Sequence, residues 1–289
     1  MKRIEIYRIR TFSDIFEDSI QWLKDNRRTV LRYIAPVVGV CVVVLSTIFL
    51  WAYIRSEKYY DADFFDETYL ATFIVFFISL WLLPTLFFTL YALYWQRENG
   101  LKDLSKKAFR KALPTMARRM FAMPIAATVC IAFIILLSAT TTVLPLFILP
   151  IGILALPPLF IYPAVVALND KGPFENIKET FSLGYKGFGT IFKISVALLF
   201  FSIVLFILSF TTLGLIVLLE VYLPYSIMNG VGKDVFEYTV CFLAFALSSA
   251  SAYFLALVAL AVAVHTYGSI KESEEGISID TKIENFENL

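Results

Sequence analysis

Long runs without charge constrain this chain more than any other feature. A helix needs about 20 apolar residues to cross the hydrocarbon core of a bilayer. Four uncharged runs meet this length, at residues 33–54, 68–95, 194–219 and 238–264. A fifth run, 120–169, is uncharged over roughly 50 residues, which is enough for two crossings with a turn near 138–145. Because the backbone in lipid must satisfy its own hydrogen bonds, each of these six spans is predicted to be a helix.

The composition agrees with a membrane protein. The chain has 289 residues, of which 59% are hydrophobic and only 17% are charged, against about 45–50% apolar and about 25% charged in a soluble domain. So many apolar residues do not fit inside one water-soluble core. We therefore expect an all-α, polytopic membrane protein with six transmembrane helices.

The distribution of Lys and Arg predicts the orientation. With six spans, all but three of the 25 Lys and Arg residues fall on one side, the exceptions being Arg55, Lys58 and Lys233. Lys and Arg are concentrated in cytoplasmic loops, so both termini are expected in the cytoplasm (N-in/C-in). The first 30 residues do not resemble a signal peptide, so the first span is expected to serve as an uncleaved insertion signal. No Asn-x-Ser/Thr acceptor occurs, which fits a bacterial cytoplasmic (inner) membrane.

A charged, aromatic-rich segment separates the fourth and fifth spans. Its apolar residues recur at intervals of three and four, at Phe174, Ile177, Phe181, Tyr185, Phe188 and Phe192. This spacing predicts one face of a helix that starts at Gly172 and Pro173 and lies at the cytoplasmic interface. Gly184, Gly187 and Gly189 are expected to let the chain bend into the fifth span.

Similar segments precede the first and third spans, which suggests a threefold repeat. The nine-residue stretches that begin at 12, 101 and 174 align without gaps and place Asp14, Asp103 and Asn176 at one position. We predict three hairpin units, each preceded by an amphipathic interfacial helix, at about 1–96, 97–170 and 171–268. An acidic, disordered cytoplasmic tail is expected at 269–289. The basic interfacial helices could gather anionic lipids, although the positive-inside rule alone explains their charge.

Two spans carry unusual residues. The fourth contains several prolines, and prolines kink a helix. Kinking for structure is the first interpretation, and a site for an apolar, lipid-like ligand is the alternative. Candidate lipid or hinge positions are Pro150, Gly152, Pro157, Pro158, Pro163, Asp170 and Lys186.

In the sixth span, small residues four apart predict close helix packing, within the monomer or between copies. These residues are Ala244, Ser248, Ala252 and Ala256.

No catalytic pattern stands out. The spans contain no Asp, Glu, Lys or Arg, whereas intramembrane sites usually use such residues. The only His, His265, is expected to be an interfacial residue, and it shares the interface with Asp170 and Glu175. The three cysteines lie apart in apolar runs, and the acidic loop between the first two spans lacks a calcium-binding pattern. We predict no enzyme activity, catalytic residue, cofactor, metal or nucleic-acid partner.

The segment 161–188 carries a resemblance to a known group. It contains Tyr162-Pro163, Asp170, Thr180 or Ser182, and Lys186-Gly187. In these features it resembles a loose bacterial superfamily of six-span proteins, which includes the membrane part of glycerophosphoryl diester phosphodiesterases and families of unknown function. The resemblance implies the six-span fold. It implies no activity, because the catalytic domain of the phosphodiesterases is soluble and has no counterpart here.

Two functions are expected from these features. The first is a non-enzymatic scaffold or assembly partner in the bilayer, which acts as a homo-oligomer or with another membrane protein. The second is a binder or transporter of a lipid or other apolar amphiphile through the proline-rich fourth span. A cavity that reaches that span would favour the second function, and a filled core would favour the first.

Overall fold

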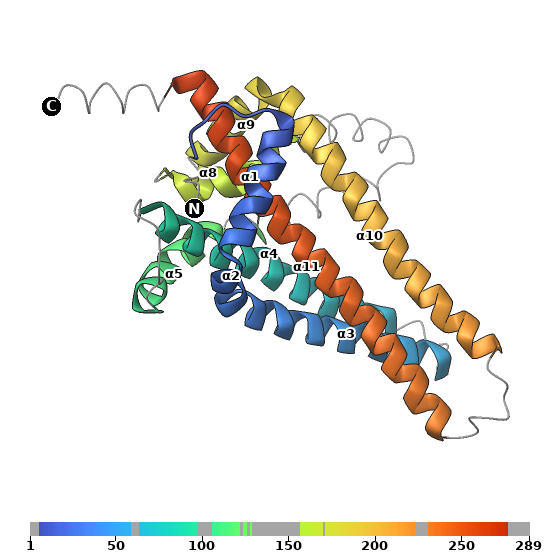
Figure 1. The fold of residues 1–289 in the computed structure, drawn as a ribbon. Helices are drawn as coiled ribbons and strands as arrows, with labels where there is room; N and C mark the ends of the chain where they lie inside the picture. Colours follow the sequence, from blue (N-terminus) through green and yellow to red (C-terminus); the bar gives the residue numbers. More distant parts are fainter. Residues whose placement is uncertain are drawn as a thin grey trace, which may run out of the picture. The chain divides into compact units, whose positions relative to one another are not determined.

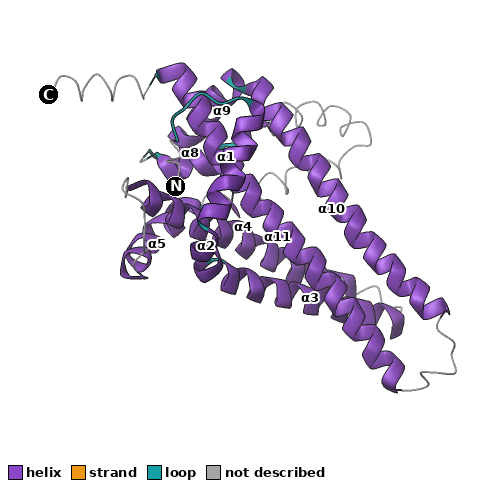
Figure 2. Ribbon diagram, in the orientation of Figure 1, coloured by secondary structure: helices purple, strands orange, loops and turns teal. Residues whose placement is uncertain are grey.

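The computed structural model describes residues 6–58, 64–96, 106–121, 124–125, 128, 157–169, 171–222 and 231–276. Every element in these ranges is an α-helix, and no strand occurs among them (Figure 2). The predicted all-α class is therefore confirmed for the described part of the chain.

The helices are labelled in Figure 1. They are α1 (Phe12–Asp25), α2 (Arg27–Tyr33), α3 (Ala35–Lys58), α4 (Phe64–Gln96), α5 (Lys106–Met120), α8 (Tyr162–Leu168), α9 (Pro173–Lys186), α10 (Phe188–Tyr222) and α11 (Val231–Glu275).

Four described helices are long and apolar enough to cross a membrane. The qualifying segments are Ala35–Ile54 in α3, Leu70–Leu93 in α4, Phe188–Leu208 in α10 and Tyr238–Glu275 in α11. They coincide with the first, second, fifth and sixth predicted spans. The third and fourth predicted spans lie in 120–169, most of which is outside the described residues.

The chain forms two compact units, and the three consecutive hairpin units of the predicted repeat do not coincide with them. The first unit comprises residues 1–32, 80–198 and 257–289, and the second comprises 33–79 and 199–256. Three long helices, α4, α10 and α11, contribute residues to both units.

Aromatic side chains of α1 and α4 form the core of the first unit. Trp22 packs against Tyr91 and Phe87, with ring centroids 5.0 and 5.4 Å apart. Thr85 and Thr89 are buried in the same part of α4, and each hydroxyl donates to the carbonyl four residues earlier in its own helix. These internal hydrogen bonds let hydroxyl groups lie in an apolar core.

The helix α1 begins at Phe12, where the first predicted repeat stretch begins, and its first turn is capped by Thr11. The Thr11 hydroxyl accepts from the Asp14 N–H, and the Asp14 carboxylate accepts from the Thr11 N–H, which together form a capping box. The helix buries Ile15, Ser19 and Trp22.

The buried faces of α1 and α9 do not follow the predicted repeat. The gapless alignment pairs Ile15 with Ile177, but Ile15 is buried and Ile177 is exposed. The helix α9 instead buries Asn176 and Thr180, one residue earlier in register. A shift of one residue turns a helical face by about 100°, so equivalent positions in the two helices meet different surroundings.

Gly184 in α9 and Gly187, which directly follows this helix, allow close packing. Gly187 separates α9 from α10 with an ordinary φ of −91°. A Cβ built on Gly184 would lie 2.6 Å from the Cβ of Pro158, and one on Gly187 would collide with the Ile270 side chain. Gly184 and Gly187 therefore let α9 approach the start of the 157–169 segment and α11, while Gly189 meets nothing.

The second unit contains α3 and parts of α4, α10 and α11. The hydroxyls of Ser79 and Tyr253 are 2.5 Å apart, and the rings of Phe49 and Phe245 stack at 5.5 Å. These contacts join α4 and α3 to α11 within this unit.

The last helix continues past the predicted end of the membrane domain. We expected the tail to begin at residue 269, but α11 runs to Glu275. Lys271 and Glu272 are largely buried there, so the first residues of the predicted tail belong to the packed structure.

Candidate functional site

The most connected group of polar side chains in the described residues lies in the first unit, and we call it the polar cluster. It consists of Asn169, Lys171, Glu179, Tyr267 and Lys271. Asn169 ends α8, Lys171 lies in the following loop, and Glu179 is on α9. Tyr267 and Lys271 are four residues apart on α11, so they lie on one side of that helix.

Hydrogen bonds link the members of the polar cluster. The Tyr267 hydroxyl donates to Asn169 Oδ1 at 3.1 Å, and Lys271 Nζ donates to that hydroxyl at 3.0 Å. The Glu179 carboxylate accepts from Lys171 Nζ at 2.7 Å and from Lys271 Nζ at 3.5 Å. The cluster thus fastens the connection between α8 and α9 to the end of α11.

Two charged members of the polar cluster are largely buried. The Glu179 and Lys271 side chains are only 12% and 13% exposed. Burial acts to raise the pKa of Glu179, but the Lys171 ammonium, the Asn169 amide and the Lys271 charge outweigh it, so the pKa lies below its ordinary 4.5. Burial also raises the pKa of nearby Tyr7 to about 12. At neutral pH, Glu179 is therefore ionised and the Tyr7 phenol is neutral.

Asn176 extends this region on α9. Its side-chain Nδ2 donates to the Lys171 carbonyl at 3.1 Å, and its own carbonyl accepts from the Thr180 hydroxyl at 2.7 Å. Asn176 does not belong to the predicted apolar face of its helix, and yet it is buried. The side chain holds the loop before α9, which explains a polar group in this position.

His265 was predicted at the membrane interface, and the structure shows that its side chain is fully buried within the protein, at 0% exposure. Its Nδ1 lies 2.9 Å from Ser19 Oγ and 3.0 Å from the Ala261 carbonyl. The Ser19 hydroxyl donates its only proton to the Ile15 carbonyl at 2.6 Å. Since Ser19 then accepts from His265, the hydrogen-bond network assigns the ring proton to Nδ1.

This Ser–His pair is unsuited to nucleophilic catalysis. An activated serine gives its proton to the histidine, whereas Ser19 gives its proton to a backbone carbonyl. Both side chains are also inaccessible to solvent. The pair instead joins α1 to α11 inside the first unit.

A second buried contact fixes the segment before α1. Arg10 Nε donates to Asp18 Oδ2 at 2.7 Å, and the Arg10 backbone N–H donates to Ser269 Oγ at 2.9 Å. The Arg10 side chain is 1% exposed. This cation therefore has a structural role in addition to its contribution to the charge asymmetry of the chain.

The predicted lipid or hinge positions do not form one group in the described residues. Pro157, Pro158 and Pro163 are buried, with Pro163 in the first turn of α8. Lys186 is exposed and pairs with Glu274 at 2.6 Å. The other three, Pro150, Gly152 and Asp170, lie outside the described residues.

The predicted packing face on α11 is mixed. Ala244 is buried, Ser248 and Ala256 are half-buried, and Ala252 is exposed. The Ser248 hydroxyl donates to the Ala244 carbonyl of its own helix at 2.9 Å, so it does not join this face to another helix.

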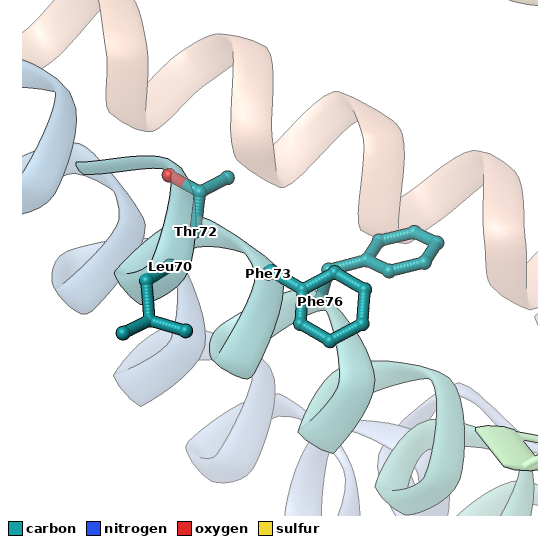
Figure 3. A pocket seen from close by; sticks show the side chains of 4 residues that line it. All are labelled: Leu70, Thr72, Phe73 and Phe76. Carbon is teal, nitrogen blue, oxygen red and sulfur yellow. The ribbon is translucent and has the colours of Figure 1, made fainter. Parts of the chain in front are cut away.

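An open apolar groove occurs on α4, in the second unit. It has a volume of about 600 Å³ and is lined by Leu70, Thr72, Phe73 and Phe76 (Figure 3). The groove lies in the second predicted span, whereas the sequence placed a lipid site in the fourth. Within the described ranges, no three His, Cys, Asp or Glu side chains are grouped so that they could hold a metal ion.

The chain matches no family model, no curated protein and no solved structure. Any function must therefore be argued from its own residues.

The polar cluster and the His265–Ser19 pair were not predicted from the sequence. One signal was present, since Tyr267 and Lys271 are one helical turn apart. The partners of these residues are distant in sequence, and no spacing rule connects Glu179 to Lys271 or Ser19 to His265.

Proposed function

We propose that the protein is a non-enzymatic, multi-pass membrane protein that acts as a scaffold or assembly partner in the bilayer. The observation that carries this proposal is that few residues of two candidate spans are fully buried by the described chain. Only 6% of the residues are fully buried in the apolar stretch of α3 (Ala35–Ile54), and only 17% in that of α10 (Phe188–Leu208). Helices with such open apolar faces suit contact with other membrane helices.

The buried polar groups support a structural role. Ser19 gives its proton to a backbone carbonyl, Glu179 is paired with two lysines, and Arg10 is paired with Asp18. A membrane enzyme needs an acid or base within reach of its substrate. These side chains serve contacts between helices instead.

The proposal includes the finer arrangement expected from the sequence. The protein would have six spans in three hairpin units, both termini in the cytoplasm, and a location in a bacterial cytoplasmic membrane. The Lys and Arg asymmetry supports the orientation. The four described membrane-spanning helices support the multi-pass character.

Photocrosslinking from α3 tests the assembly role. A benzophenone amino acid would replace Val43, which is 53% exposed, or the nearby Ser46, which is buried on the same helix. We expect a discrete protein adduct from position 43 in native membranes and only intramolecular products from position 46. Adducts with lipid alone at position 43 would contradict an assembly role for this face.

The α4 groove favours a second function, the binding of an apolar amphiphile. Its walls include two phenylalanines, a leucine and the methyl-bearing Thr72, which suit an acyl chain. The test is binding of a spin-labelled fatty acid to wild type and to Phe73→Ala and Phe76→Ala, with the exposed Leu247→Ala as control. Selective loss of binding in the two groove variants would support this function, and equal binding by all four proteins would oppose it.

A further inference from the structure

The helix α9 has three faces, where an ordinary amphipathic helix has two. One face is buried and contains Asn176, Thr180, Leu183 and Gly184. A second face is polar, exposed or partly exposed, and contains Glu175, Lys178, Glu179, Ser182 and Lys186. The third is the aromatic stripe, formed on α9 by Phe174, Ile177, Phe181 and Tyr185 and continued by Phe188, the first residue of α10.

The aromatic stripe is directed away from the core of the first unit. Phe174 is 88% exposed and Tyr185 is 54% exposed. A surface helix normally turns its apolar stripe toward the core, but here the core contact is made by the face with Asn176 and the glycines. Core packing therefore does not explain the stripe.

The stripe continues into a membrane-spanning helix. The rings of Phe181, Tyr185, Phe188 and Phe192 follow one another at centroid distances of 6.0, 6.5 and 5.9 Å. This ladder passes Gly187, which separates α9 from α10, and enters α10, whose candidate span begins at Phe188. The stripe therefore contacts the same apolar surroundings as the start of α10.

Charges border the stripe as they do in interfacial helices. Lys178 is exposed and lies four residues after Phe174, so it flanks the stripe. Lys193 is exposed and directly follows the last ring of the ladder. Aromatic rings favour the headgroup level of a bilayer, and lysines there contact anionic headgroups.

We propose that the aromatic stripe of α9 binds the lipid interface of the leaflet in which α10 begins, with Lys178 and Lys193 at its anionic headgroups. The stripe would hold α9 parallel to the membrane while the opposite, glycine-containing face holds the first unit. This inference rests on the membrane location and not on the proposed assembly role, so each is tested separately.

Site-directed spin labelling tests the position of the stripe. Single cysteines at Phe174→Cys and Ser182→Cys would be introduced after replacement of Cys41, Cys130 and Cys241. The two sites are both exposed on α9 and differ in face. In vesicles of phosphatidylcholine and phosphatidylglycerol, we expect the label at 174 to be more accessible to oxygen than to a water-soluble nickel chelate. The order should be reversed at 182.

Two results would overturn the proposal. Access of the nickel chelate to both labels would place the stripe in water. Protection of position 174 from both reagents, with spin–spin broadening, would show that a second copy covers it.

A measurement on the unaltered chain avoids dependence on the cysteine replacements. Phosphatidylcholine with a diazirine near its headgroup would be crosslinked in the same vesicles, and the adducts mapped by mass spectrometry. Adducts are expected within 174–192 on stripe residues, and adducts confined to α10 beyond that range would contradict the inference.

Discussion

At the scale of single residues, largely buried charged side chains stabilise the first unit. Glu179 lies between two lysines, and its removal leaves Lys271 with a Tyr267 hydroxyl and a distant Glu275 carboxylate at 3.9 Å. A largely buried cation that loses its nearest counter-charge costs free energy. The polar cluster is therefore expected to contribute to stability more than a surface ion pair does.

Replacement of Glu179 by Gln tests this expectation. We expect Glu179→Gln to lower the free energy of unfolding by about 1.5–3 kcal/mol, the usual range for hydrogen bonds to charged groups. The exposed Glu175→Gln is the control on the same helix and should change stability by less than about 0.5 kcal/mol. Denaturant titration in detergent micelles gives both values, and equal effects of the two changes would contradict the account.

The same variant has a pH signature. The pKa of Glu179 is lowered in the folded state, so the unfolded chain binds its proton more readily. The stabilisation is therefore complete above the ordinary value of 4.5 and is lost as the pH falls through the lower folded value. The difference in stability between wild type and Glu179→Gln should shrink on acidification below pH 4.5, and a constant difference would refute this assignment.

At the scale of helices, α9 depends on glycine for its close contacts. Gly184→Ala would place a Cβ 2.6 Å from the Cβ and 2.7 Å from the Cα of Pro158. The backbone atom cannot turn aside, so we expect a loss of about 1–3 kcal/mol from overpacking. Gly189→Ala meets nothing and should be neutral or stabilising by up to about 1 kcal/mol. Thermal unfolding of both variants checks this, and the reverse order would show that α9 packs differently.

The sequence predicts helices better than it predicts which face of each helix is buried. The starts of α1 and α9 and four apolar helices were predicted from apolar periodicity, from Gly172 and Pro173 at the start of α9, and from run length. The aromatic stripe was also recognised as one face of α9, but periodicity does not tell lipid from protein as the apolar neighbour. Gly184, Asn176 and His265 acquire their roles from residues such as Pro158, Lys171 and Ser19, and their contacts depend on how the helices are brought together.

At the scale of the whole molecule, the charge asymmetry predicts one orientation. A reporter attached after Gly276, where the described α11 has ended, is expected on the cytoplasmic side because Lys and Arg are concentrated there. A green fluorescent protein fusion should therefore fluoresce, and an alkaline phosphatase fusion at the same site should be inactive in a bacterial host. An active phosphatase would place this end of the chain outside and would contradict the N-in/C-in orientation.

The proposed assembly role concerns contacts between this protein and other helices in the membrane. Few residues in the apolar stretches of α3 and α10 are fully buried by the described chain, and we propose that other membrane helices contact their exposed faces. A protein that bound only lipids would have the same composition, so composition does not separate the two functions.

Native mass spectrometry of the protein released from mild detergent distinguishes the assembly role from lipid binding most directly. The account predicts a defined complex larger than the 32.9 kDa chain, either a homo-oligomer or a stoichiometric complex with another membrane protein. This complex should be weakened by Val43→Ser on the open face of α3 and retained in Ser182→Ala. A monomer that carries one defined lipid and no protein partner would contradict the assembly role and favour the binding of an apolar amphiphile.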